Sequence, residues 1–236
     1  MERGLFVFDF NRTKAVLWDL DDTLYNRRSA AEKLFTDMMK DLLYTGQSET
    51  FYREVASVML RLAGRENMLR QETFSALFRL YPPDHPFNHA ICNDYYLENI
   101  HRYIDGPYLR QMEIVRSLRN HGVRNAIVTN GKIPDVQWRK IRVMHLEEEF
   151  DDILVSGDIG YHKPDPRIYD CAAKRLGMKN NDCLFVGDSD TTDIPGAIAA
   201  GMEAVWLDVL DAKNVFSSYP SVSKIRQIDE YFGNVK

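Results

Sequence analysis

The chain has 236 residues, of which 44% are hydrophobic and 28% charged, and its formal net charge is −5. This composition is typical of a globular protein and excludes a disordered chain, and the length is enough to bury a core in one large or two small domains. Because non-specific nucleic-acid binding needs a basic face and the sequence has no basic run, we expect no nucleic-acid partner.

No apolar stretch approaches the ~20 residues that span a bilayer, so we expect no membrane partner. Acidic and polar residues interrupt the first apolar run, in MERGLFVFDFNRTK, too early for a signal peptide. The three cysteines, Cys92, Cys171 and Cys183, are too scattered for a disulfide framework and form no CxxC pair. These features predict a cytoplasmic location.

The first apolar run, residues 15–20, is continuous rather than alternating, which predicts a strand buried on both faces. After it, a stretch of roughly 80 residues shows helical periodicity and no convincing strand, and a crossover rarely needs that length. We interpret it as an inserted helical domain at residues 26–106. Its helical spacing comes from two sets of residues: Ala31, Leu34, Phe35, Met38 and Leu42, and Phe51, Val55, Val58 or Met59, and Leu62.

The rest of the chain alternates helical patterns with four further apolar runs, and this alternation predicts an open parallel sheet covered on both faces. Pro134 and Pro166 each open a helix, at a position where a missing N–H costs little. The predicted fold class is α/β, with a Rossmann-like doubly wound parallel sheet as the core (residues 1–25 and 107–236) and an inserted α-helical cap domain. The later strands are expected at 125–129, 153–156, 183–187 and 204–207, and the first later helix, 108–120, carries Leu109, Met112, Val115 and Leu118 on one face.

Polar side chains gather after four of these strands, at the ends where ligands bind in open α/β sheets. Each group has an ordinary explanation on its own, as a loop, a turn, a solvated lysine or a helix N-cap. Their joint occurrence in this order points to one site. The residues are Asp19 and Asp21 after the first strand, Thr129 and Asn130 after the second, Lys163 after the third, and Asp188 and Asp193 after the fourth.

The series DLDDTL, TNG, the lysine of GYHKPDP, and GDSDTTD resembles the four motifs of the haloacid dehalogenase-like hydrolase superfamily, over residues 14–207. The insertion resembles, in its position, the helical cap of that superfamily's first subclass. The nearest resemblance is to small-metabolite phosphatases, such as house-cleaning 5′-nucleotidases and N-acylneuraminate-9-phosphatase. It implies hydrolysis of a small phosphorylated metabolite through an aspartyl-phosphate intermediate.

A dianionic phosphate that approaches several carboxylates needs a divalent cation, and hard oxygen ligands select Mg²⁺. The resemblance implies that Asp19 and Asp188 bind Mg²⁺ through their carboxylates and that Asp21 binds it through its backbone carbonyl. It also implies that Asp19 is the nucleophile and that Asp21 protonates the leaving group and then activates water.

The remaining motif residues would hold the transferred phosphate. The resemblance implies that Lys163 and the Thr129 hydroxyl contact its oxygens, with the backbone N–H of Asn130 as a further donor. Asp193 would orient Lys163 or a metal-bound water, or cap the helix that follows it.

Three rival activities share this set of residues in part. A haloacid dehalogenase needs neither a metal nor an acid two residues after its nucleophile, so Asp21 and Asp188 argue against it. A phosphomutase shares every core residue and stays open. A non-catalytic binding protein is disfavoured because no motif residue is lost. A cap over a small pocket favours a soluble metabolite, and the sequence leaves open a nucleotide, a sugar phosphate or phosphoglycolate, and the oligomeric state.

Overall fold

The computed structural model describes residues 8–63, 71–86, 88–208 and 222–235. The chain divides into two compact units: residues 1–25 with 106–236, here called the core unit, and residues 26–105, here called the helical unit. Gly106 thus belongs to the core unit, one residue from the expected boundary. Residues 1–7, which begin the run used to argue against a signal peptide, lie outside the described residues. No helix in the described ranges is long and apolar enough to cross a membrane.

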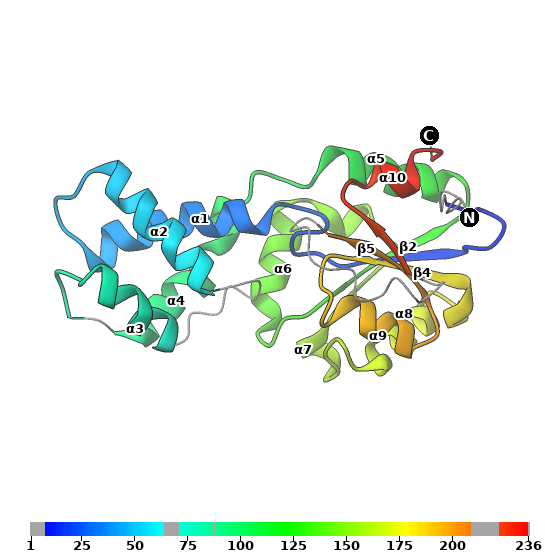
Figure 1. The fold of residues 1–236 in the computed structure, drawn as a ribbon. Helices are drawn as coiled ribbons and strands as arrows, with labels where there is room; N and C mark the ends of the chain where they lie inside the picture. Colours follow the sequence, from blue (N-terminus) through cyan, green and yellow to red (C-terminus); the bar gives the residue numbers. More distant parts are fainter. Residues whose placement is uncertain (1–7, 64–70, 87, 209–221, 236) are drawn as a thin grey trace, which may run out of the picture. The chain divides into compact units, whose positions relative to one another are not determined.

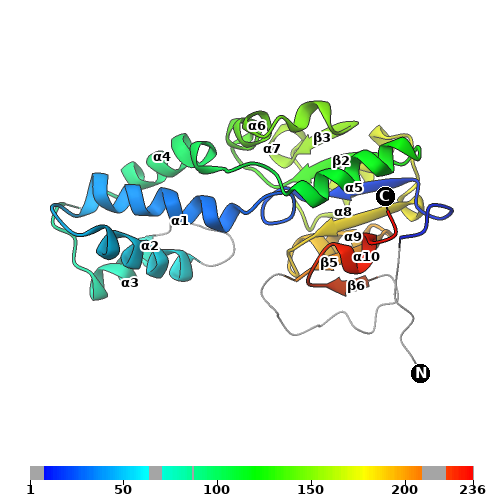
Figure 2. The same ribbon diagram turned by 90° about the horizontal axis from the view of Figure 1, so that it is seen from above.

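The core unit is built on a six-stranded sheet in which all neighbouring strands are parallel (Figures 1 and 2). The strand order is β3-β2-β1-β4-β5-β6, so the order in which the chain adds strands reverses between β1 and β4. This arrangement confirms the predicted α/β class with a Rossmann-like parallel sheet. The strands are β1 Ala15–Trp18, β2 Arg124–Thr129, β3 Asp152–Val155, β4 Cys183–Gly187, β5 Glu203–Leu207 and β6 Val222–Ile225.

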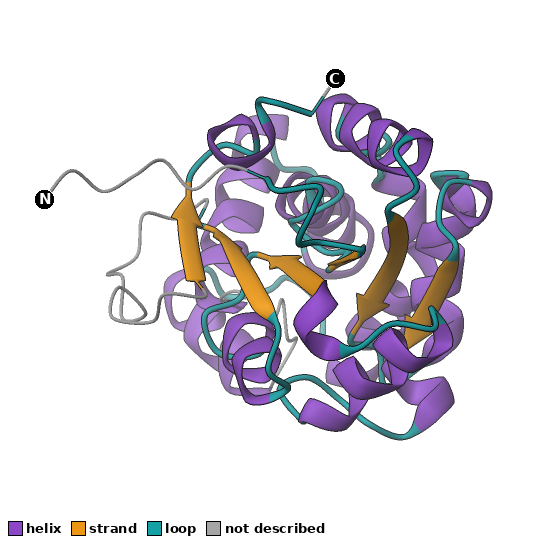
Figure 3. Ribbon diagram, turned by 90° about the vertical axis from the view of Figure 1, so that its right-hand side faces the viewer, coloured by secondary structure: helices purple, strands orange, loops and turns teal. Residues whose placement is uncertain are grey.

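Helices cover both faces of the sheet (Figure 3). On one face Phe185 of β4 packs against Tyr169, with ring centroids 4.9 Å apart, and on the other Trp18 of β1 stacks on Phe232 at 5.6 Å. Because side chains alternate along a strand, burial on both faces requires continuous apolar runs, and every residue of β1 and β4 is buried. The helices of the core unit include α5 Leu109–Asn120, α6 Pro134–Val143, α7 Ser156–Ile159, α8 Pro166–Arg175, α9 Asp193–Ala199 and α10 Asp229–Phe232.

The predicted helix starts are confirmed in the core unit. Pro134 is the first residue of α6, and Asp165 caps α8 by accepting a hydrogen bond from Arg167 N at 3.0 Å. The expected apolar face of α5 is wrong in one position, because Leu109 is 81% exposed while Met112, Val115 and Leu118 are buried. Leu109 is the first residue of that helix, so it precedes the turns that pack on the sheet.

In its described residues the helical unit packs four α-helices around an apolar core, and Asn26 caps the first by accepting from Ser29 N at 2.8 Å. After Met38 the chain makes a π-helical turn, Met39–Leu43, which adds a residue to the turn and rotates the following side chains. Leu43 is therefore buried where Leu42 was expected. The helices are α1 Arg27–Met38, α2 Glu49–Ala63, α3 Gln71–Leu80 and α4 His89–Asn99, and on α2 it is Val55 and Met59 that are buried, whereas Leu62 is exposed.

Candidate active site

The candidate site lies at the carboxyl ends of the central strands, which all point to the same edge of a parallel sheet. Asp19 directly follows β1 and Asp188 directly follows β4, and these two strands pair in register from Ala15 with Cys183 to Trp18 with Val186. The strand order reverses at this pair, which is where open α/β sheets form their ligand crevice.

A buried lysine joins two of the predicted carboxylates. Lys163 Nζ lies 2.5 Å from Asp19 Oδ1 and 2.7 Å from Asp193 Oδ1, and the three side chains are 2%, 9% and 1% exposed. Asp193 Oδ1 is paired with the Lys163 ammonium, and this contact compensates its burial. Both carboxylates and the cation are needed for this arrangement, because any one of them alone would be an unpaired buried charge.

The charges in this group shift one another's proton affinities. Burial, with smaller contributions from the charges of Asp193 and Asp21, raises the pKa of Asp19 to about 7, although Lys163 opposes the shift. Burial alone would lower the pKa of Lys163, but the carboxylates of Asp19 and Asp193 outweigh it and raise that pKa. The two carboxylates therefore favour the charged form of Lys163 beside Asp19.

Asn130 fixes the segment that carries this lysine. Its Oδ1 accepts from Lys163 N at 2.8 Å and its Nδ2 donates to Lys163 O at 2.9 Å. A second link runs through Ser156, whose Oγ accepts from Gly131 N at 2.9 Å and lies 2.7 Å from His162 Nδ1. The side chain of Asn130 thus ties the end of β2 to the lysine, which is a role that sequence reasoning did not assign.

The Asp193 side chain contacts Lys163 and does not cap the helix that it begins. The residue begins α9 but its side chain accepts no hydrogen bond from that helix, and its Oδ2 accepts instead from Ser189 N at 3.0 Å. A Cβ at Gly187 would collide with the Asp193 carboxylate, so the glycine at the end of β4 is what allows this close approach. The sequence leaves three roles open for Asp193: to orient Lys163, to orient a metal-bound water, or to cap the helix. The contact with Lys163 fits the first.

A divalent cation fits the carboxylates at this edge. Asp19, Asp188 and Asp193 each present an oxygen within 4.8 Å of the others. Lys163 and Ser189 already occupy the two oxygens of Asp193, whereas Asp19 keeps its Oδ2 clear of hydrogen-bond donors from the described residues. Carboxylate oxygens are the ligands that Mg²⁺ prefers, and the predicted ligands Asp19 and Asp188 are therefore in place to share one ion.

Asp21 lies in a different environment from Asp19. Asp22, which follows it, has a left-handed backbone with a φ of 61°, a conformation that aspartate tolerates. The Asp21 carboxylate is not part of the group that could hold a metal. It contacts Lys140 Nζ at 2.9 and 3.1 Å and Gln137 Nε2 at 3.1 Å. Asp19 and Asp21 thus have separate partners.

Thr129 is joined to the environment of Asp21. It ends β2, is 1% exposed, and its Oγ1 accepts from Gln137 Nε2 at 2.6 Å. Gln137 and Lys140, both on α6, were not predicted. A signal was present, because the buried face of this helix reads Val136, Gln137, Lys140, Ile141, and two polar residues there interrupt an apolar pattern.

The structure brings Asp19, Lys163, Asp188 and Asp193 together and holds Asp21 and Thr129 through a second set of contacts. A family profile described as haloacid dehalogenase-like hydrolase matches residues 13–201. The chain is similar to the hydrolase YfnB of Bacillus subtilis, whose structure was solved with bound magnesium, at 26% identity and a TM-score of 0.68 over 93% of this chain and 96% of that one.

Two relatives of established name are similar along most of their length. Glyceraldehyde 3-phosphate phosphatase of Methanopyrus kandleri is 31% identical over 81% of this chain and 82% of its own. Human N-acylneuraminate-9-phosphatase is 27% identical over 84% of each chain. With the profile match and the four motifs gathered at one sheet edge, these similarities show that the protein is an enzyme and belongs to the haloacid dehalogenase-like hydrolase family.

Proposed function

We propose that this enzyme is a Mg²⁺-dependent phosphatase that hydrolyses a small phosphorylated metabolite through a phosphoaspartate on Asp19. The observation that carries the proposal is the division of the first motif. Asp19 is buried against Lys163, and Asp21 has its own donors two residues later. Two carboxylates in separate environments can perform two different roles, one as nucleophile and one as acid and base.

In the first step Asp19 Oδ2 attacks phosphorus, a new O–P bond forms, and the bond to the substrate's leaving oxygen breaks. Asp21 gives its proton to that oxygen, which leaves as an alcohol. Lys163 balances the negative charge on the phosphate oxygens, and the Thr129 hydroxyl and the backbone N–H of Asn130 donate to them.

In the second step a water molecule attacks the phosphorus of the acyl phosphate. Asp21, now unprotonated, takes a proton from that water, and the bond between phosphorus and Asp19 breaks. Inorganic phosphate leaves, Asp19 is restored as a carboxylate and Asp21 as an acid. Asp193 keeps the Lys163 ammonium directed at the Asp19 carboxylate through both steps.

Asp19 and Asp188, with the backbone carbonyl of Asp21, would hold Mg²⁺ in this site. When bound, the ion offsets the repulsion between the dianionic substrate and the carboxylates. Burial raises the pKa of the Asp19 carboxyl to about 7, and a cation beside this carboxylate would favour its ionised, nucleophilic form.

The substrate is proposed only as a class. The two named relatives act on different phosphate esters, glyceraldehyde 3-phosphate and N-acylneuraminate 9-phosphate. We propose that the helical unit is a cap that selects among such compounds, and that the protein works in the cytoplasm. Phosphatase is favoured over phosphomutase because both relatives are named phosphatases.

The experiment is a screen of purified protein against phosphorylated metabolites, including the relatives' two substrates, with Mg²⁺ and with EDTA. Phosphate should be released from at least one compound with Mg²⁺ and from none with EDTA. Intact-mass and peptide mapping of rapidly quenched reactions should find the phosphate adduct on Asp19. Full activity without metal, or an adduct on another residue, contradicts the proposal, and transfer of phosphate to a second position of the substrate identifies a mutase.

A further inference from the structure

A buried lysine outside the four motifs contacts the proposed acid and base. Lys140 of α6 is 3% exposed, and its Nζ lies 2.9 Å from Asp21 Oδ1 and 3.1 Å from Oδ2. An ammonium is almost never fully buried unless it is paired. Among the described residues Asp21 is the carboxylate that pairs with Lys140. The cation is therefore committed to this one side chain.

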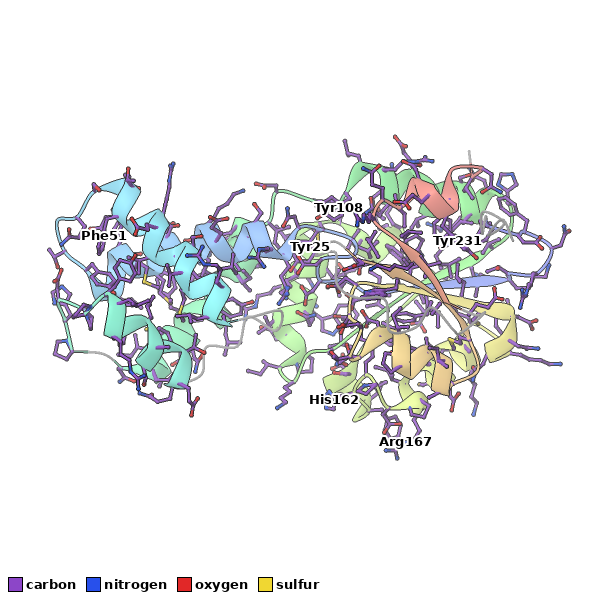
Figure 4. All side chains as sticks on the ribbon, in the orientation of Figure 1. Tyr25, Phe51, Tyr108, His162, Arg167 and Tyr231 are labelled. Atoms are coloured by element: carbon purple, nitrogen blue, oxygen red, sulfur yellow. The ribbon has the colours of Figure 1, made fainter. Side chains whose placement is uncertain are left out.

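Two further buried groups hold the same carboxylate. The Tyr25 hydroxyl donates to Asp21 Oδ1 at 2.5 Å, and Gln137 Nε2 donates to Oδ2 at 3.1 Å. Tyr25 and Gln137 are 1% and 3% exposed. Figure 4 marks Tyr25 and Tyr108, whose segments are joined by a hydrogen bond from Tyr108 N to Leu24 O at 2.8 Å. Among the described residues, each oxygen of Asp21 thus has at least two donors, which hold its orientation.

One face of α6 connects Asp21 with the proposed phosphate site. Gln137 and Lys140 are three residues apart, so they lie on the same side of the helix. Gln137 Nε2 also donates to Thr129 Oγ1 at 2.6 Å. Gly131 allows this approach, since a Cβ there would lie 2.5 Å from Gln137 Cγ. The orientation of the acid and that of the phosphate-binding hydroxyl are therefore set by the same element.

We propose that Lys140 is a positioning residue that holds Asp21 for proton transfer, with Gln137 and Tyr25 completing the arrangement. The inference rests on the proposed phosphatase function. A general acid or base has to lie within hydrogen-bond reach of its proton, and a misplacement of about 1 Å costs about 10²-fold in rate. The role belongs to no residue of the four motifs.

The test compares Lys140→Met on two substrates. An alkyl phosphate needs a proton on its leaving oxygen, so its kcat/KM should fall by about 10²-fold. With p-nitrophenyl phosphate, whose leaving group needs no proton, kcat/KM should change less than about 5-fold. Both kcat and KM should fall together, because a misplaced Asp21 activates water poorly in the second step. A burst of p-nitrophenol before a slow steady rate should appear.

Arg142→Met is the matched control, because Arg142 is an exposed cation of the same helix, and it should behave like the wild type.

A double-mutant cycle separates positioning from a general structural effect. In an Asp21→Asn background, Lys140→Met should cause no further loss of kcat/KM on the alkyl phosphate, since a residue that acts through Asp21 has nothing left to position. Loss of the same factor in both backgrounds, or equal losses on both substrates in the single variant, overturns the inference.

Tyr25→Phe provides a variant that removes one hydroxyl and little volume, for the case that Lys140→Met does not fold. It should show the same contrast between the two substrates at a smaller size, about 10-fold on the alkyl phosphate, and the absence of any contrast overturns the inference. A wild-type protein without Mg²⁺-dependent hydrolysis refutes the proposed function itself. An active wild type with uniform losses in the variants refutes only the role of Lys140.

Discussion

In the described part of the helical unit, ion pairs lie at the surface, as in Lys33 with Asp105, whose side chains are 46% and 75% exposed. The core unit also has surface pairs, but at one edge of its sheet it buries Lys163 between two carboxylates, with side-chain exposures of 2%, 9% and 1%. A surface pair is worth about 0–1 kcal/mol, whereas taking charges out of water costs several kcal/mol per ion. The cost of burying Lys163 with two carboxylates therefore points to a role for this group besides stability.

The largest expected difference between the buried carboxylate of the site and a neighbouring carboxylate is in catalysis. Asp19→Asn should lower turnover on the order of 10⁴-fold or more and leave no phosphoenzyme, because the nucleophile is lost. Asp22→Asn removes the same charge three residues away, at a φ of 61° that asparagine also tolerates, and should stay within a few-fold of wild type. Steady-state rates and intact mass measure both. Equal losses of turnover in the two variants would contradict the role of Asp19 as the nucleophile.

The second expected effect is on stability. Lys163→Met leaves two buried carboxylates without their cation and should cost about 3–5 kcal/mol of unfolding free energy. Arg116→Met removes a surface cation of the same unit, which pairs with Glu149, and should cost no more than about 1 kcal/mol. Urea unfolding followed by tryptophan fluorescence compares them, since Trp18, Trp138 and Trp206 all belong to the core unit. A similar loss of unfolding free energy in both variants would contradict the distinction between the buried ion pairs of Lys163 and the surface pair of Arg116.

Metal should stabilise the core unit through the same carboxylates. Mg²⁺ at about 100 times its Kd should raise the unfolding free energy by about 2.7 kcal/mol, because it binds the folded site and not the unfolded chain. Asp188→Asn should abolish this gain. Asp190→Asn, in the same loop but outside the group that could hold a metal, should keep it. Calorimetry with and without EDTA gives the shift, and a gain that survives in Asp188→Asn would place the ion elsewhere.

A smaller cost is expected at Asp21, whose side chain is 24% exposed while that of Lys140 is 4% exposed. Asp21→Asn leaves a buried ammonium without a carboxylate and should destabilise the core unit by about 2 kcal/mol, less than for a fully buried pair. Adding Lys140→Met removes the orphaned charge and should recover most of this loss. If the double variant is instead less stable than Asp21→Asn, the lysine stabilises the fold through its packing and not through its charge.

The strands of the sheet and the polar residues at their ends could largely be predicted from the sequence, for a geometric reason. Continuous apolar runs mark strands buried on both faces, and parallel strands end at one edge, so polar residues after β1, β2 and β4 had to meet. The same logic cannot find β6, because VSKI has no continuous apolar run and pairs with a single neighbour, β5.

Side-chain partners are harder to predict than strand ends. Lys140 and Gln137 sit on a helix, and a polar residue there is ordinarily solvated, so that only their place between Val136 and Ile141 indicates burial. The π-helical turn after Met38 has no sequence signal that we recognise, and it exchanges Leu42 for Leu43 in the core. Register inside an element is thus set by packing that the local pattern does not contain.

The smallest expected effect tests the other half of the comparison. Lys33→Met removes the cation of a pair that lies 2.6 Å from Asp105 and is open to solvent. Water and salt screen such a pair, and the side-chain entropy lost in forming it offsets most of the attraction, so the cost should stay below about 1 kcal/mol and shrink further at high salt. Far-ultraviolet circular dichroism is the measurement, since the helical unit contains no tryptophan. A larger loss that salt does not change would show that this surface pair has a structural role like the buried ones, and the contrast between the two units would then rest on the chemistry of the active site alone.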